Sequence, residues 1–113
     1  MNIEQLLPKP NCKIQFKLSF YKSVPKISGV YLLTTLQNDI LYIGLSDNLY
    51  NRFQQHLDNV EKTQPTLNGK AVWFFYLEYD IKNLPKLERT WINQYESMHG
   101  ELPILNKISS PIS

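Results

Sequence analysis

Cysteine is almost absent from this sequence, because Cys12 is the only one among 113 residues. A single cysteine cannot form an intramolecular disulfide or a thiolate metal site, so disulfide-stapled scaffolds and zinc-finger-like domains are excluded. Such a chain suits a reducing compartment, and we expect a cytoplasmic protein.

Long apolar runs are also missing. No stretch approaches the ~18 consecutive apolar residues that a membrane span requires. The first eleven residues, MNIEQLLPKPN, lack the basic region and the long apolar run of a signal peptide. We therefore expect no association with a membrane.

The sequence also has little excess of either positive or negative charge. The formal net charge is +2 and the isoelectric point is near 8.6, which permits nucleic-acid binding without arguing for it. A hydrophobic content of 42% indicates a globular chain, and its length suits one domain with a single core. We divide it into an N-terminal arm or extra strand (1–28), a central domain (29–106) and a tail (107–113).

Four segments have the pattern of strands. Residues 13–20, KIQFKLSF, alternate apolar and polar side chains, which predicts a half-buried strand or an arm laid across the body. Residues 29–36 and 40–44 read as two strands joined by a turn. Residues 71–79, AVWFFYLEY, are apolar on both faces and predict a strand that is covered on both sides.

Two segments have the pattern of helices, and residues 58–70 between them read as a polar loop. The first helix follows Gly44, begins at a cap on Asp47 or Asn48, and has a core stripe of Leu49, Phe53 and Leu57. The second starts near Pro85 and stops at Gly100. Its apolar positions at helical spacing are Leu87, Trp91, Tyr95 and Met98.

Two tyrosines converge if the first two strands form a hairpin with an even loop. With a loop such as Asn38-Asp39, Thr35 faces Tyr42, and the period of two puts Tyr31 on the same face. An odd loop would send the two tyrosines to opposite faces. Gly44 lies on the same face by the same parity. Because glycine has no side chain, another group can approach the backbone closely there.

Charged side chains gather beside this face. Arg52 and His56 are i, i+4 neighbours on the flank of the first helix, which packs back over the sheet. Glu88 precedes Trp91 by three residues and so borders the apolar side of the second helix. This set suits phosphodiester chemistry: a guanidinium for phosphate oxygens, a carboxylate for Mg²⁺ and a phenol to handle a proton.

Five short motifs occur in a definite order, and with them the sequence resembles the GIY-YIG nuclease domain. They are GVY at 29–31, YIG at 42–44, NRFQQH at 51–56, LERTWINQY at 87–95 and LN at 105–106. The resemblance covers Gly29 to Asn106 and implies an α/β fold with a small three-stranded antiparallel sheet flanked by helices. Val30 replaces the usual Ile, and Leu45 follows YIG where many members carry Lys or another polar residue.

The resemblance also implies roles for six residues. Tyr31 would be the general base for a water or a relay to one, Tyr42 would position that water or the phosphate, and His56 would assist the phenol. Arg52 would stabilise the pentacovalent phosphate, Glu88 would bind one divalent ion, and Asn106 would buttress the site.

We accordingly predict a metal-dependent endonuclease that hydrolyses phosphodiester bonds, with DNA favoured over RNA as its substrate and one Mg²⁺ or Mn²⁺ on Glu88. We expect Arg52 and a metal-bound water to lower the pKa of Tyr31, or His56 to take the proton through a relay. Three rivals stay open. They are a non-cleaving nucleic-acid-binding module, an enzyme in which Tyr31 attacks phosphorus covalently, and an interaction module whose N-terminal strand is an edge for β-augmentation.

Binding of nucleic acid is expected to use lysines outside the catalytic group, and no separate DNA-binding domain is visible. Targeting is therefore predicted to come from the N-terminal arm, the 58–70 loop, a homodimer or a partner. The lysines predicted to contact phosphates are Lys13, Lys17, Lys26 and Lys70.

Overall fold

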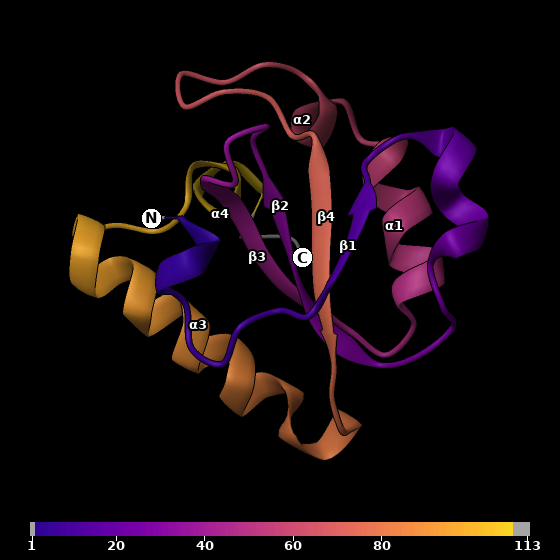
Figure 1. The fold of residues 1–113 in the computed structure, drawn as a ribbon. Helices are drawn as coiled ribbons and strands as arrows, with labels where there is room; N and C mark the ends of the chain where they lie inside the picture. The colour runs from indigo at the N-terminus through magenta and orange to yellow at the C-terminus, as the bar shows by residue number, and fades with distance from the viewer. Residues whose placement is uncertain (1, 110–113) are drawn as a thin grey trace.

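The computed structural model describes residues 2–109. One antiparallel sheet has the strand order β1-β4-β2-β3, and helices cover both of its faces (Figure 1). The strands are β1 (Cys12–Gln15), β2 (Gly29–Thr34), β3 (Ile40–Ser46) and β4 (Trp73–Glu78). The α-helices are α1 (Leu49–Leu57), α2 (Val60–Thr63), α3 (Leu84–His99) and α4 (Ile104–Ser109), and the 3₁₀ helices are η1 (Ile3–Gln5), η2 (Leu18–Ser23) and η3 (Ile81–Asn83). The predicted α/β class is confirmed.

The sheet separates two hydrophobic cores. On one side, called the tyrosine face, the rings of Tyr31, Tyr42 and Phe74 pack with residues of α1 and α4. On the other, called the α3 face, Leu32 and Phe75 pack with residues of α3. Figure 1 shows α1 and α3 on opposite sides of the sheet. Among the described residues, no helix is long and apolar enough to cross a membrane.

The N-terminal segment is an integral part of both cores. Leu6 is buried in the α3-face core, and Phe16 is buried in the tyrosine-face core. Between them β1 pairs with β4, which makes it the fourth strand and confirms the extra strand. The strand pattern predicted as far as Phe20 is wrong, because the chain turns into η2 and leaves Leu18 and Phe20 64% and 41% exposed. A 3₁₀ helix has three residues per turn, so the period of two ends there.

The β2–β3 hairpin has an odd loop, contrary to the predicted register. The Thr35 N–H donates to the Asp39 carbonyl (2.9 Å) and the Asn38 N–H to the Thr35 carbonyl (3.0 Å), around a left-handed Asn38 with φ 70°. A bulge at Leu41 then adds one residue to β3, so that Leu33, and not Thr35, pairs with Tyr42. The odd loop and the bulge each shift the register by one residue. Together they leave Tyr31 and Tyr42 on the same face of the sheet, as an even loop would have done.

Both predicted helices form near their predicted ends. Asn48 caps α1 by accepting from the Asn51 N–H, Pro85 lies in the first turn of α3, and Gly100 ends α3 at φ 73°. Met98 is not a core residue, since it is 53% exposed in the last turn of α3, beyond the core contacts that end at Tyr95.

Two segments that the sequence predicted to be irregular contain helices. The predicted polar loop 58–70 includes α2, which Asn59 caps by accepting from the Glu61 N–H (2.9 Å). The predicted tail begins inside α4, which continues to Ser109, and its residues 110–113 lie outside the described part of the chain.

Candidate active site

The two motif tyrosines lie on one face of the sheet, as predicted. Their ring centroids are 6.0 Å apart, and the Tyr31 ring stacks on Phe74 at 5.1 Å. A Cβ atom at Gly44 would lie 2.6 Å from the Tyr31 hydroxyl oxygen and 2.8 Å from the Tyr42 ring. The glycine of YIG is therefore required because the phenol of Tyr31 occupies the space that any other side chain would need.

A short hydrogen bond joins Tyr31 to the helix above it. The Tyr31 Oη lies 2.5 Å from the His56 Nε2, and both side chains are buried. Burial lowers the pKa of His56 to about 3, with smaller contributions from the positive charges of Lys62 and Arg52. His56 is therefore neutral at physiological pH, and in the tautomer that carries its proton on Nδ1 its Nε2 accepts a hydrogen bond from the phenol.

Arg52 by itself does not bring the pKa of Tyr31 below its ordinary value, as the sequence had led us to expect. Burial raises the pKa of this phenol well above 10, and the charge of Arg52 opposes the rise without cancelling it. An isolated phenolate at Tyr31 is therefore disfavoured. The relay to His56, the other route expected from the sequence, is the one that this geometry can support.

The buried neutral His56 predicts a particular loss of stability in acid. Its pKa is about 3 in the folded chain and 6.5 in an ordinary setting, so below pH 6.5 only the unfolded state gains a proton there. The free energy of unfolding should fall as the pH falls through this window, by about 2 kcal/mol at about pH 5.

Urea unfolding at about pH 7.5 and about pH 5 measures this loss. His56→Gln is the matched control, since glutamine can accept the hydrogen bond from Tyr31 but does not titrate. Wild type should lose about 2 kcal/mol more than the variant between the two pH values. Equal losses in the two proteins would contradict a neutral His56.

Arg52 and Glu88 approach the tyrosines from two different helices. Arg52 is half-buried one turn before His56 on α1, and its charge opposes the raised pKa values of Tyr31 and Tyr42. Glu88 is half-buried on α3, and its negative charge contributes to the raised pKa of Tyr42, after burial as the main cause. The structure thus brings Arg52 within electrostatic reach of both phenols and Glu88 within reach of Tyr42.

Glu88 has the properties of a carboxylate that a cation would stabilise. Burial raises its pKa, and the neighbouring Arg89 only partly offsets this. The described residues include no group of three or more His, Cys, Asp or Glu side chains that could hold a metal. Mg²⁺ keeps several waters and often takes one or two carboxylates plus phosphate oxygens, so Glu88 fits such an ion without a protein cage.

Asn106 supports the site through the backbone of β3. Its Nδ2 donates to the Ile43 carbonyl and its Oδ1 accepts from the Ile43 N–H, both at 2.9 Å. This amide from α4 pairs with the free side of an edge strand, as another strand would. Because Ile43 lies between Tyr42 and Gly44, Asn106 is a positioning residue of the kind that the motif implied.

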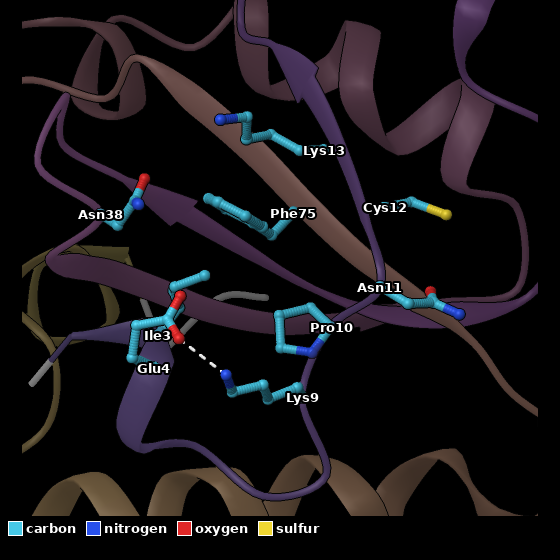
Figure 2. Close-up of a pocket in the computed structure, with 9 residues that line it drawn as sticks. All are labelled: Ile3, Glu4, Lys9, Pro10, Asn11, Cys12, Lys13, Asn38 and Phe75. Atoms are coloured by element: carbon cyan, nitrogen blue, oxygen red, sulfur yellow. Dashed lines mark hydrogen bonds and ion pairs between the residues drawn. The ribbon is translucent and has the colours of Figure 1, made fainter.

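The four lysines predicted to bind nucleic acid are all exposed. The Lys13 Nζ lies 4.0 Å from the centre of the Trp73 ring, and Lys13 pairs in register with Phe75 of the opposite core. Figure 2 shows Lys13 and Phe75 lining a pocket beside η1, which the Lys9–Glu4 ion pair borders. The predicted role of Lys13 at phosphates is therefore separate from the catalytic group.

Sequence reasoning missed Lys62. Its side chain is only 3% exposed, and its Nζ lies 4.6 Å from the centre of the Tyr42 ring. The polar composition of residues 58–70 concealed it, because a loop lysine is ordinarily solvated. The signal that was available is Asn59, a residue that favours the cap position of a short helix.

Comparison with known proteins identifies the family. The pattern of the GIY-YIG catalytic domain matches residues 27–101. The chain belongs to the GIY-YIG family. The match ends before Asn106, which the family resemblance of the sequence had included.

Individual relatives match over much of this GIY-YIG chain but over little of their own length. The UvrABC system protein C of Prochlorococcus marinus (strain MIT 9312) is 35% identical over an alignment of 75 positions, which covers 59% of this chain and 12% of the relative. That of Mycoplasma genitalium is 32% identical over 66% of this chain and 13% of the relative. The bifunctional monothiol glutaredoxin-S16, chloroplastic, of Arabidopsis thaliana is 28% identical over 75% of this chain and 28% of the relative.

Proposed function

We propose that this protein is a metal-dependent endonuclease that hydrolyses phosphodiester bonds in DNA, with Tyr31 and His56 as a proton relay. The observation that carries the proposal is the 2.5 Å contact between the Tyr31 Oη and the His56 Nε2. It lies beside Tyr42 and the charge of Arg52, within a GIY-YIG domain. Phosphodiester hydrolysis needs a group that takes a proton from the attacking water and a positive charge beside the phosphate oxygens. A hydrogen-bonded acid–base pair next to a guanidinium supplies both.

The relay lets a phenol of high pKa act as a base without becoming a phenolate. It forms an imidazolium at His56, which the lowered pKa of that residue opposes, so the negative charge of a bound phosphate beside His56 has to raise this pKa during the reaction. A water attacks phosphorus and gives its proton to the Tyr31 oxygen, while the phenol passes its own proton to the His56 Nε2. The phosphorus–oxygen bond to the leaving sugar oxygen breaks, and that oxygen takes a proton from solvent. Tyr31 is thus never a free phenolate, in agreement with its raised pKa.

Arg52 and Glu88 have separate tasks in this scheme. Arg52 contacts the non-bridging phosphate oxygens, on which negative charge increases in the transition state. Glu88 would hold one Mg²⁺ or Mn²⁺, which supplies positive charge to the phosphate when it is bound. Tyr42, which feels the charges of both residues, would orient the phosphate or the attacking water.

Cleavage of labelled nucleic acids tests the proposal. The purified chain should convert at least one DNA in a panel of duplex, nicked, flapped, branched and single-stranded forms into shorter strands with Mg²⁺ or Mn²⁺. Matched RNA panels test whether RNA is a substrate instead of DNA, and EDTA should stop the reaction. Binding of DNA without cleavage of any member, in the presence of either metal, would instead identify a non-cleaving module of the same fold.

A further inference from the structure

The positive charge of this protein is concentrated near its N-terminus. Residues 5–38 contain five lysines and no aspartate or glutamate. The whole chain has 12 basic and 10 acidic residues, so the remainder holds seven basic and all ten acidic side chains. The family match begins at residue 27, and all five lysines precede it. The GIY-YIG pattern therefore accounts for none of this charge.

Three of these lysines lie around η2. Lys17 directly precedes this 3₁₀ helix, Lys22 lies within it, Lys26 follows it, and all three are exposed. None of them forms an ion pair with a carboxylate among residues 2–109. Exposed lysines are ordinarily solvated, so their charge alone does not select a ligand.

Aromatic rings lie beside two of these charges. Tyr21 of η2 and Tyr50 of α1 are both half-buried, and their ring centroids are 5.9 Å apart. The Lys26 Nζ lies 5.0 Å from the centre of the Tyr50 ring, and the Lys22 Nζ lies 6.0 Å from the centre of the Tyr21 ring. Phe20, the neighbour of Tyr21, is 41% exposed. We call these five side chains the η2 surface.

The fold fixes the η2 surface against α1. The Tyr50 N–H donates to the Pro25 carbonyl (3.1 Å), and the Leu49 N–H donates to the Ile27 carbonyl (2.9 Å). Tyr21 also packs against the tyrosine-face core. Figure 1 shows the coil of η2 beside α1, and the two elements are in contact. A ligand would therefore meet rings that are already in place, which lowers the entropic cost of binding.

Helix α1 connects the η2 surface to the catalytic group. Successive helical residues are rotated by about 100°, so Tyr50 and Arg52 lie on opposite flanks of α1. This helix has no acidic residue, and Asn51 and Gln55 are exposed on its outer side. A nucleic-acid strand that crosses α1 from Arg52 to Tyr50 therefore meets no carboxylate of this helix.

We propose that the η2 surface binds unpaired nucleotides of DNA beside the cleavage site, with bases on its aromatic rings and phosphates on Lys22 and Lys26. This inference rests on the proposed function, because it names the form of DNA that the same site receives. Lysines beside aromatic rings are typical of surfaces that bind single strands through stacking and phosphate contacts. The bases of an intact duplex stack on one another and leave the rings without a partner. The preferred substrate is therefore DNA with an unpaired strand, such as a flap or an overhang.

Binding of fluorescent oligonucleotides in EDTA tests the preference without cleavage. Fluorescence anisotropy gives the Kd for oligo(dT), for a blunt duplex and for that duplex with a dT overhang. Wild type should bind oligo(dT) and the overhang duplex about tenfold more tightly than the blunt duplex, because stacking adds to the phosphate contacts. Equal or tighter binding of the blunt duplex would overturn the proposal.

Two variants separate the charges from the rings. The double variant Lys22→Gln with Lys26→Gln should lower the slope of log Kd against log salt concentration by about 1.4, because each phosphate contact on a single strand contributes about 0.7. Tyr50→Leu should weaken binding of oligo(dT) about tenfold and leave this slope unchanged, because stacking releases no counterions. Unchanged binding of oligo(dT) in both variants would contradict the proposal.

Matched controls are available at exposed positions outside the η2 surface. They are Lys82→Gln with Lys86→Gln for the charges and Tyr79→Leu for the ring, and both should bind as wild type does. Urea unfolding establishes that each variant is folded. If wild type cleaves DNA but the η2 variants bind and cleave normally, only this inference fails. If the variants lose binding but wild type cleaves nothing, only the proposed function fails.

A second copy of the chain is the rival occupant, because Leu18 and Phe20 are 64% and 41% exposed beside this surface. Analytical ultracentrifugation of wild type and Phe20→Ser measures this alternative. A wild-type monomer leaves the surface open to DNA, as the proposal requires. A wild-type dimer that Phe20→Ser dissociates, with binding of oligo(dT) unchanged, would make this face an interface between copies and overturn the proposal.

Discussion

Replacing Glu88 with glutamine is expected to reduce metal-dependent cleavage by about 10³-fold or more, because a bound metal ion is worth several kcal/mol of transition-state stabilisation. The free energy of unfolding should not decrease. Burial raises the pKa of Glu88, so its charged form is disfavoured where it lies, and a neutral amide of the same shape removes that cost. We therefore expect Glu88→Gln to be as stable as wild type or slightly more stable, and Glu88→Ala to be equally inactive.

Cleavage rates at several Mg²⁺ concentrations and urea unfolding measure the two effects. Glu96→Gln is the matched control, since Glu96 is an exposed glutamate on the same helix. It should cleave at the wild-type rate. If Glu88→Gln kept wild-type activity at any Mg²⁺ concentration, the metal site would not be at Glu88.

Replacing Tyr31 with phenylalanine is expected to reduce cleavage by about 10²- to 10⁴-fold, since the variant loses the acid–base group of the relay. Some stability should be lost too, on the order of 1–3 kcal/mol, because the buried His56 Nε2 loses its hydrogen-bond donor. The rate loss alone does not decide the mechanism. A relay and a covalent attack by Tyr31 on phosphorus both require the hydroxyl.

The product decides between these two mechanisms. With labelled DNA and metal, the relay releases free nicked strands and leaves no denaturation-resistant band at the mass of protein plus DNA. Tyr79→Phe is a suitable control, because Tyr79 is an exposed tyrosine outside the site. An adduct that forms in wild type and disappears in Tyr31→Phe, or full activity in EDTA, would establish the covalent class.

The convergence of the two tyrosines was predictable from sequence, but the details of the hairpin were not. Period-two alternation leaves only two outcomes for Tyr31 and Tyr42, the same face or opposite faces. The actual loop is odd, and the bulge at Leu41 corrects the parity. The residues around Leu41 do not predict a bulge, because a bulge is stabilised by the packing of both faces of the strand.

The effect of Arg52 on the pKa of Tyr31 could not be predicted for a related reason. A nearby arginine indicates a lowered pKa if the phenol is partly hydrated, and the depth at which the ring lies cannot be read from the sequence. In the fold its ring stacks on Phe74 and fills the space above Gly44, and this burial outweighs the charge of Arg52. Desolvation depends on every neighbour at once, so no short motif encodes it.

By itself the sequence determined the α/β class, the two main helices with their caps and stops, and the family through five ordered motifs. These are properties of spacing, of glycine and proline positions and of side-chain type, all of which are local. Only the tertiary structure decided that Asn106 holds the backbone of Ile43, that His56 is buried and neutral, and that Lys62 lies over Tyr42. Each of these depends on contacts between distant segments, whose burial and charge arise only when the chain has packed.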